Sequence, residues 1–136
     1  IYKMNFTASA QLSEPYVSAG VMAVVGDTDE HAQYLFSSVQ QQFANLRRGS
    51  NEPMPAPVDS IEAKLQEHEL AAINHTLRYA VVGDEQTVEQ QLSDFVAATD
   101  IDEVILSVPI YDPTLCLDAV SKIGSMTQVK AAPSWR

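Results

Sequence analysis

One pattern occurs three times along this chain: a short apolar run, a turn, and a helix with one apolar face. The clearest copy spans residues 79–96. Its first residues, YAVV, predict a buried strand, Gly83 ends that strand, and Asp84 is a suitable helix N-cap. Apolar residues then recur at the spacing of one helical face, namely Val88, Leu92, Phe95 and Val96. Alternating strands and helices predict an α/β fold with parallel strands and right-handed crossovers.

The first copy begins at Tyr16 with YVSAGVMAVV, in which apolar character is continuous rather than alternating. A continuous run is typical of a strand that is covered on both faces of a parallel sheet. Asp27 or Thr28 then caps a helix predicted over residues 30–48. We expect the glutamines at 40–42 to face water. The predicted buried face consists of Ala32, Leu35, Phe36, Val39, Phe43 and Leu46.

The third copy starts with a strand predicted over residues 102–108. Asp112 and Pro113 form a helix start, because aspartate caps the first turn and proline is tolerated at the first helical position. We expect this helix to end at Gly124, with an inner stripe of Leu115, Ala119, Val120 and Ile123. Residues 125–136 carry little pattern, and we expect them to lie on the surface or to add a last short element.

Residues 50–77 separate the first predicted helix from the second strand. The segment opens with SNEPMPAPVD, whose alternate prolines exclude a helix and favour an extended path. A small helix is predicted over residues 60–77, with a break near Gln66. We interpret residues 50–77 as an insertion rather than a domain boundary, so that residues 1–136 form a single unit.

The composition limits what the chain can bind. Eighteen acidic residues against eight basic ones give a formal charge of −10, which argues against nucleic acid and anionic membranes as partners. No apolar run is long enough to span a bilayer, and we find no secretory signal. The single Cys116 leaves no internal disulfide, and together these features predict a cytoplasmic protein. Because the first residue is Ile1 rather than Met, we expect either that something was removed or that this is a piece of a longer chain.

Several chemistries lack their motifs. The histidines are His31, His68 and His75, and no two are four residues apart, the step that places two zinc ligands on one helical face. We therefore predict no metal site. The sequence has no G-x-S-x-G, G-x-G-x-x-G or phosphate-binding loop. Cys116 falls in the first turn of the last helix, where we expect it to pack as a small hydrophobe rather than to act as a thiolate.

Three stretches resemble, in order, segments of the bacterial luciferase-like, flavin-dependent monooxygenases. VMAVVGDTDEHAQYLFSSVQQQFANLRRG is similar to that family's strand followed by A-D-T-D-E-E-A and a helix ending L-x-R-G. YAVVGDEQTVEQQL resembles V-V-G-S-P-E-T-V-x-x-x-L, and DEVILSVPIYDPTLCLDAV resembles D-E-L, an apolar run and I-Y-D-x-x-x-R-L. The chain departs from the family at residues 84–86, where D-E-Q replaces S-P-E, and at Leu117, near a common arginine.

The resemblance implies a (β/α)₈ TIM barrel of which this chain is the last three βα units. Residues 1–136 would then be a partial domain, the C-terminal fragment of the barrel. A parallel sheet of three strands has open edges, so we expect the fragment to be completed by self-association into a homo-oligomer. Residues 50–59 lie where family members carry a lid-like loop.

The resemblance also implies a chemistry. The intact enzyme would use reduced FMN and O₂ to oxygenate a small organic substrate, whereas the fragment alone is expected to be inactive and to hold no cofactor. Candidate cofactor-binding residues are Ser107 and Tyr111, which would face the isoalloxazine or the substrate, and Arg47 and Arg48, which would reach an anionic cofactor. No residue is identified as catalytic. Asp27, Asp84 and Asp112 are interpreted as helix caps, which repel phosphate.

Two alternatives to the FMN-dependent enzyme remain open. The chain could be a piece of a barrel that uses the deazaflavin F420 instead of FMN. It could also be a non-enzymatic α/β module that oligomerises through its sheet. An initiator Met and a clean first element would favour the module, whereas IYKMNF begins as though within a helix.

Overall fold

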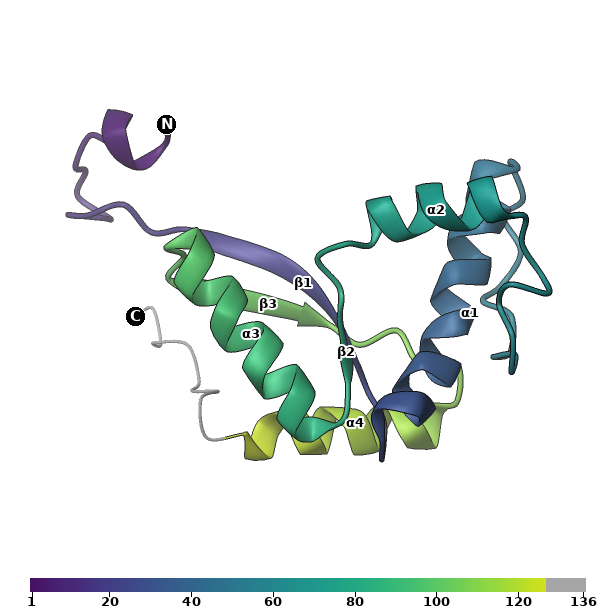
Figure 1. The fold of residues 1–136 in the computed structure, drawn as a ribbon. Helices are drawn as coiled ribbons and strands as arrows, with labels where there is room; N and C mark the ends of the chain where they lie inside the picture. Colours follow the sequence, from purple (N-terminus) through teal and green to yellow (C-terminus); the bar gives the residue numbers. More distant parts are fainter. Residues whose placement is uncertain (127–136) are drawn as a thin grey trace.

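The computed structural model describes residues 1–126, and the prediction for the tail at 127–136 lies outside the described residues. Strands and helices alternate along most of the chain (Figure 1). The elements are η1 (Lys3–Asn5), β1 (Ser18–Val25), α1 (Asp29–Arg47), α2 (Glu67–Thr76), β2 (Val81–Gly83), α3 (Glu85–Thr99), β3 (Glu103–Ser107) and α4 (Pro113–Ser125).

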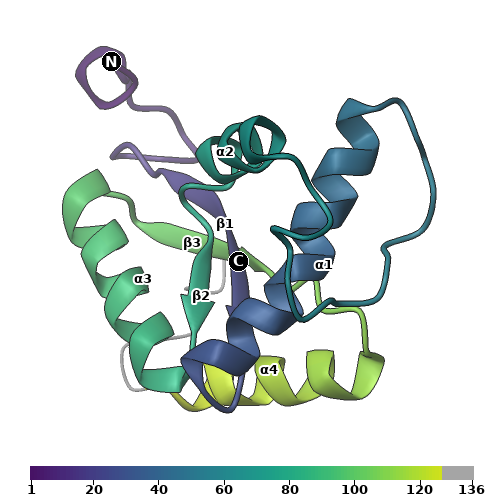
Figure 2. The same cartoon turned by 45° about the vertical axis from the view of Figure 1, so that its right-hand side comes forward.

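The sheet is parallel, in the order β2-β1-β3. β1 pairs with β3 through its first five residues, 18–22, and with β2 through its last three, 23–25. Helices α1 and α3 lie on either side of β2 (Figure 2). The predicted α/β class, with parallel strands separated by helices, is confirmed. The strand order adds a fact that the local patterns did not contain, because β3 is the neighbour of β1 rather than of β2.

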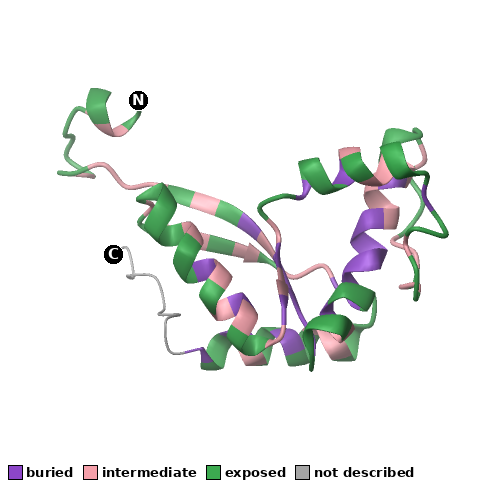
Figure 3. Ribbon diagram, in the orientation of Figure 1, coloured by how far each residue is buried: buried purple, intermediate pink, exposed green. Residues whose placement is uncertain are grey.

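One face of the sheet is bare near its amino end. The strand register places Gly20 beside Ile105 and Met22 beside Ser107, with their side chains on the same face. Gly20 and Ser107 are exposed, and Ile105 is 59% exposed. We call this the bare face, made of Ser18, Gly20, Met22, Glu103, Ile105 and Ser107. The prediction that β1 is covered on both faces is therefore correct only for its carboxyl half (Figure 3).

Four residues have a solvent exposure opposite to that predicted. Leu46, Val96 and Val120 were expected in the core and are 48%, 39% and 49% exposed. Leu46 and Val96 lie in the last turns of their helices. Gln40 was expected in water and is buried, because α2 packs over it and the Gln40 Nε2 donates to Asn74 Oδ1 at 2.9 Å.

The outer edge of β2 is closed by a side chain. The Val82 N–H donates to Gln91 Oε1 at 2.9 Å, and Gln91 Nε2 donates to the Val82 carbonyl at 3.3 Å. One carboxamide on α3 thus satisfies both backbone groups that a neighbouring strand would pair with. Native sheets commonly block their edges in such ways, because unpaired edges recruit other chains.

Residues 50–66 are docked along α1. Gln42 donates to the Glu52 carbonyl at 3.3 Å, Gln41 donates to the Ala56 carbonyl at 3.0 Å, and the Val58 N–H donates to Ser37 Oγ at 2.8 Å. The segment therefore runs back along α1 toward the helix N-terminus. The predicted break near Gln66 is confirmed, because Gln66 is the N-cap of α2 in a reciprocal capping box with Glu69.

Candidate active site at the carboxyl edge of the sheet

The carboxyl ends of β1, β2 and β3 lead into the turns that precede α1, α3 and α4. In parallel α/β folds this edge carries the ligand site. Two of the turns are tied together, since the Asp84 N–H donates to Asp29 Oδ1 at 2.9 Å. Both turns need glycine: a Cβ at Gly26 would lie 2.5 Å from the Ala32 nitrogen, and one at Gly83 would lie 2.4 Å from the Thr87 side chain.

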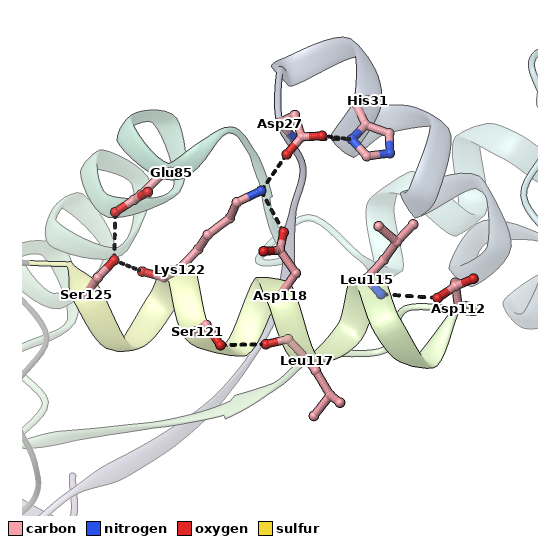
Figure 4. A network of polar contacts seen from close by, with 10 residues as sticks. All are labelled: Asp27, His31, Glu85, Asp112, Leu115, Leu117, Asp118, Ser121, Lys122 and Ser125. Carbon is pink, nitrogen blue, oxygen red and sulfur yellow. Dashed lines mark hydrogen bonds and ion pairs between the residues drawn. The ribbon is translucent and has the colours of Figure 1, made fainter.

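A charged network joins α4 to this edge (Figure 4). Helix α4 runs across the carboxyl ends of β1 and β2 (Figure 1). The Lys122 Nζ donates to Asp27 Oδ1 at 2.6 Å and lies 2.8 Å from Asp118 Oδ2. The Asp27 N–H donates to His31 Nδ1 at 3.1 Å, so this imidazole nitrogen acts as an acceptor. The ammonium thus holds two carboxylates at the end of the first strand.

The network shifts the acid–base equilibria of its members. The hydrogen bond and charge of Lys122 hold the pKa of Asp27 below its ordinary value of 3.8. Hydrogen bonds to Asp118 and Asp27 hold the pKa of Lys122 above its ordinary value of 10.5. Each charged form stabilises the other.

These shifts predict how stability depends on pH. A carboxylate with a lowered folded pKa contributes stability above its unfolded pKa, and this contribution is lost as the pH falls through the folded value. We expect the urea midpoint to fall as the pH drops below 3.8, with Asp27 as one cause. Asp27→Asn should reduce the difference between the midpoints at pH 7 and pH 3. An unchanged difference would contradict the assignment.

Removing the ammonium tests the network directly. In Lys122→Met we expect the pKa of Asp27 to rise toward its ordinary value, because its principal partner is lost. The free energy of unfolding should change little, since water and salt screen ion pairs at the surface. The carboxyl carbon resonance of Asp27, followed by NMR against pH, gives the pKa. Lys64→Met is a matched control, and a similar rise there would refute the assignment.

The remaining aspartates at this edge act as helix caps. Asp84 Oδ1 accepts from the Thr87 N–H at 2.8 Å, and Asp112 Oδ1 accepts from the Thr114 N–H at 2.7 Å. Both interpretations as caps are confirmed, whereas α1 is capped by Thr28, which accepts from the His31 N–H. These turns present carboxylates, and Lys122 is already engaged. The described residues at this edge therefore do not fit a flavin phosphate.

Ser107 lies where it could contact the isoalloxazine ring of the flavin that the family resemblance implies. It is the last residue of β3, it is exposed, and on the bare face it stands beside Met22. Tyr111 follows in the next turn and is 51% exposed. These three side chains carry no charge, so they suit an aromatic ring better than a phosphate. Met22 was not singled out from the sequence, because only the register places it next to Ser107.

Arg47 and Arg48 lie elsewhere. They are at the C-terminal end of α1, and a helix of 19 residues is about 28 Å long, so α1 carries them away from the carboxyl edge. Both nitrogens of the Arg48 fork donate to Glu69, at 3.0 Å from Nε and 2.8 Å from NH2. The Gln66 N–H and then Arg48 hold the pKa of Glu69 below its ordinary value. Ser107 and Tyr111 therefore lie at the end of β3 and in the turn that follows it, whereas the arginines lie at the far end of α1.

The Cys116 Sγ donates to the Val108 carbonyl at 3.3 Å and is half-buried, which agrees with its interpretation as a packed small side chain.

A cavity of about 310 Å³ lies between α1, α2 and α3, and its polar lining is Gln33, Gln40, Asn74 and Gln91. Among residues 1–126 no three His, Cys, Asp or Glu side chains are placed to hold a metal ion.

No helix within residues 1–126 combines the length and apolar character needed to cross a membrane.

The chain has relatives of known sequence. It is 31% identical over 112 residues to a protein of Escherichia coli (strain K12) named luciferase-like monooxygenase, and the match covers 82% of this chain and 33% of that protein. The chain is related to the luciferase-like monooxygenases. The predicted family resemblance is thereby confirmed, and the chain spans about a third of the length of the curated relatives it matches. No family model matches the sequence.

Two further comparisons agree with this relationship. The uncharacterized protein YvbT of Bacillus subtilis (strain 168) is 34% identical over 112 residues, again 82% of this chain and 33% of the relative. The crystal structure of apo-MsnO8 superposes with a TM-score of 0.69 over 89% of this chain and 37% of that chain, at 18% identity. At this identity the superposition supports the fold alone, an α/β architecture consistent with part of a barrel.

Proposed function

We propose that this chain is the C-terminal part of a cytoplasmic flavin-dependent monooxygenase. When complete, the enzyme uses reduced FMN and O₂ to oxygenate a small organic substrate. The observation that carries the proposal is the sequence match with the luciferase-like monooxygenase of E. coli, which covers most of this chain and a third of that protein. The bound flavin supplies the reaction with O₂, and the protein supplies position and a dry pocket.

The bare face is the side of the sheet that turns toward the flavin in this proposal. In a barrel the helices lie outside and the pocket lies within, at the carboxyl ends of the strands. We assign that position to Ser107, the last residue of β3, to Met22 beside it in the register and to Tyr111 in the following turn. They contact and orient the ring, while the phosphate is held by parts of the complete protein beyond this chain.

A hybrid enzyme tests the proposal. The matched third of the E. coli relative is replaced with this chain, and FMN binding is measured by the quenching of flavin fluorescence, because free reduced FMN consumes O₂ without any enzyme. We expect the hybrid to retain FMN binding that the chain alone lacks. The parent protein is the control for folding and binding. A folded hybrid that does not bind FMN, beside a parent that does, would contradict the proposal.

A side-chain change in the hybrid tests the ring contact. We expect Ser107→Phe to weaken FMN binding by about tenfold or more, because the larger side chain would occupy the space of the ring. Arg47→Gln, at the far end of α1, is the matched control and should alter the affinity by less than about twofold. Quenching of flavin fluorescence measures both affinities. Equal affinities in the two variants would show that Ser107 is not at the ring.

A further inference from the structure

We propose that the cavity between α1, α2 and α3 binds a small uncharged molecule that carries an amide group on an apolar body. The cavity has a volume of about 310 Å³, which is within the range of small-molecule sites. All of its lining residues lie within residues 33–91, and none of them belongs to the bare face. The proposal therefore concerns a second site and does not rest on flavin use.

Gln40 supplies the acceptor of this site. It is 7% exposed and is the most buried of the four carboxamides that line the cavity. Within residues 1–126 its side chain makes one hydrogen bond, from Nε2 to Asn74 Oδ1 at 2.9 Å. The Gln40 Oε1 has two lone pairs, and a buried polar atom without a partner is costly. An N–H group of a molecule in the cavity would satisfy this oxygen.

Asn74 supplies the complementary donor. Its Oδ1 is taken by Gln40, whereas its Nδ2 donates to no group within residues 1–126. Gln33 adds another carboxamide to the same wall, but Gln91 is unavailable because both of its ends bond the backbone of Val82. A planar amide places a C=O acceptor beside an N–H donor, so one such group can pair with both Asn74 and Gln40.

The lining also selects against charge. Among the described residues no charged side chain lines the cavity. Burying an ion without a partner of opposite charge costs far more than burying an amide that is hydrogen-bonded. The apolar part of the lining suits the body of the ligand and consists of Phe36, Leu77, Ala80 and Val82.

A second hollow lies on the other side of the carboxamide wall. This acidic groove has a volume of about 860 Å³ and shares Gln33, Gln40 and Asn74 with the cavity. Its lining includes the carboxylates of Asp29, Glu30, Asp59 and Glu62. A cation should prefer the acidic groove, so ligands of equal shape and different charge distinguish the two hollows.

Binding of benzamide to the hybrid enzyme tests the site, because the hybrid supplies the rest of the fold. Benzoate and benzamidine have nearly the same shape and carry a negative and a positive charge. We expect benzamide to bind with a dissociation constant on the order of 1 mM, as suits so small a ligand. Benzoate should bind at least about tenfold more weakly. Saturation-transfer NMR measures the constants, and added FMN should leave that of benzamide unchanged.

Substitutions in the wall locate the ligand. Gln40→Leu should weaken benzamide binding by about fivefold or more, because the acceptor is lost while the volume is kept. Gln90→Leu makes the same change at an exposed residue of α3 outside the cavity, and should alter the constant by less than about twofold. Because Gln40 is buried, circular dichroism checks the fold of each variant. Asn74→Leu changes an exposed residue and should weaken binding by about threefold or more.

Three results would overturn the inference. The first is that benzamide does not bind. The second is that the leucine variants at Gln40, Asn74 and Gln90 bind it equally well. The third is that benzamidine binds more tightly than benzamide and is released by salt, which would assign the ligand to the acidic groove. A hybrid that binds no FMN would contradict the proposed function but would leave the benzamide constants unchanged.

Discussion

Replacing Gly26 with alanine is expected to lower the free energy of unfolding by about 3 kcal/mol. The added Cβ would lie 2.5 Å from the Ala32 nitrogen and 2.9 Å from its Cα, and both are backbone atoms. A side chain can rotate away from such a contact, but the first turn of α1 cannot move without also shifting its Thr28 cap. The urea-induced unfolding transition, followed by circular dichroism, measures the loss.

Gly124→Ala is the matched control for this change. A Cβ at Gly124 has no atom within 4 Å, and the residue lies near the end of α4. Alanine in a helix is favoured over glycine by about 0.5–1 kcal/mol, so this variant should be as stable as the wild type or slightly more stable. If the two variants lose equal stability, the close approach at Gly26 is not the cause.

Replacing Ile73 with alanine should cost about 3 kcal/mol as well, by a different mechanism. Ile73 is 1% exposed and is the one buried residue of α2, so it anchors that helix to the core. Alanine would leave a cavity beneath the helix. We expect faster amide exchange throughout α2 together with a lower urea midpoint, because Ile73 is the one side chain that α2 buries fully.

An exposed leucine provides the comparison for Ile73. Leu117 is 70% exposed on α4, and Leu117→Ala should change the free energy of unfolding by less than about 0.5 kcal/mol. The two substitutions remove side chains of similar size from helices. A loss at Leu117 equal to that at Ile73 would mean that burial in the described fold does not determine the cost.

Local sequence patterns were sufficient to predict where the helices begin. Asp84 and Asp112 cap α3 and α4 as predicted, because a cap depends on the three residues that follow it. The parallel arrangement also followed from the alternation of strands and helices. The same local reasoning placed Ser107 at the end of a strand, and the register then put that residue on the bare face.

Contacts between distant residues could not be predicted in this way. Lys122 and Asp27 are 95 positions apart, and only the path of α4 across the sheet brings them together. Gln40 is buried because α2 returns over α1, a consequence of the insertion that its own surroundings in sequence do not reveal. The separation of the arginines from Ser107 likewise follows from the direction and length of α1.

The structure of the hybrid enzyme with bound FMN tests the central claim most directly. We expect the isoalloxazine to lie against the bare face beside Ser107, with its phosphate held by residues outside this chain. A flavin bound near Arg47 and Arg48, or on the face of the sheet covered by α3, would contradict it.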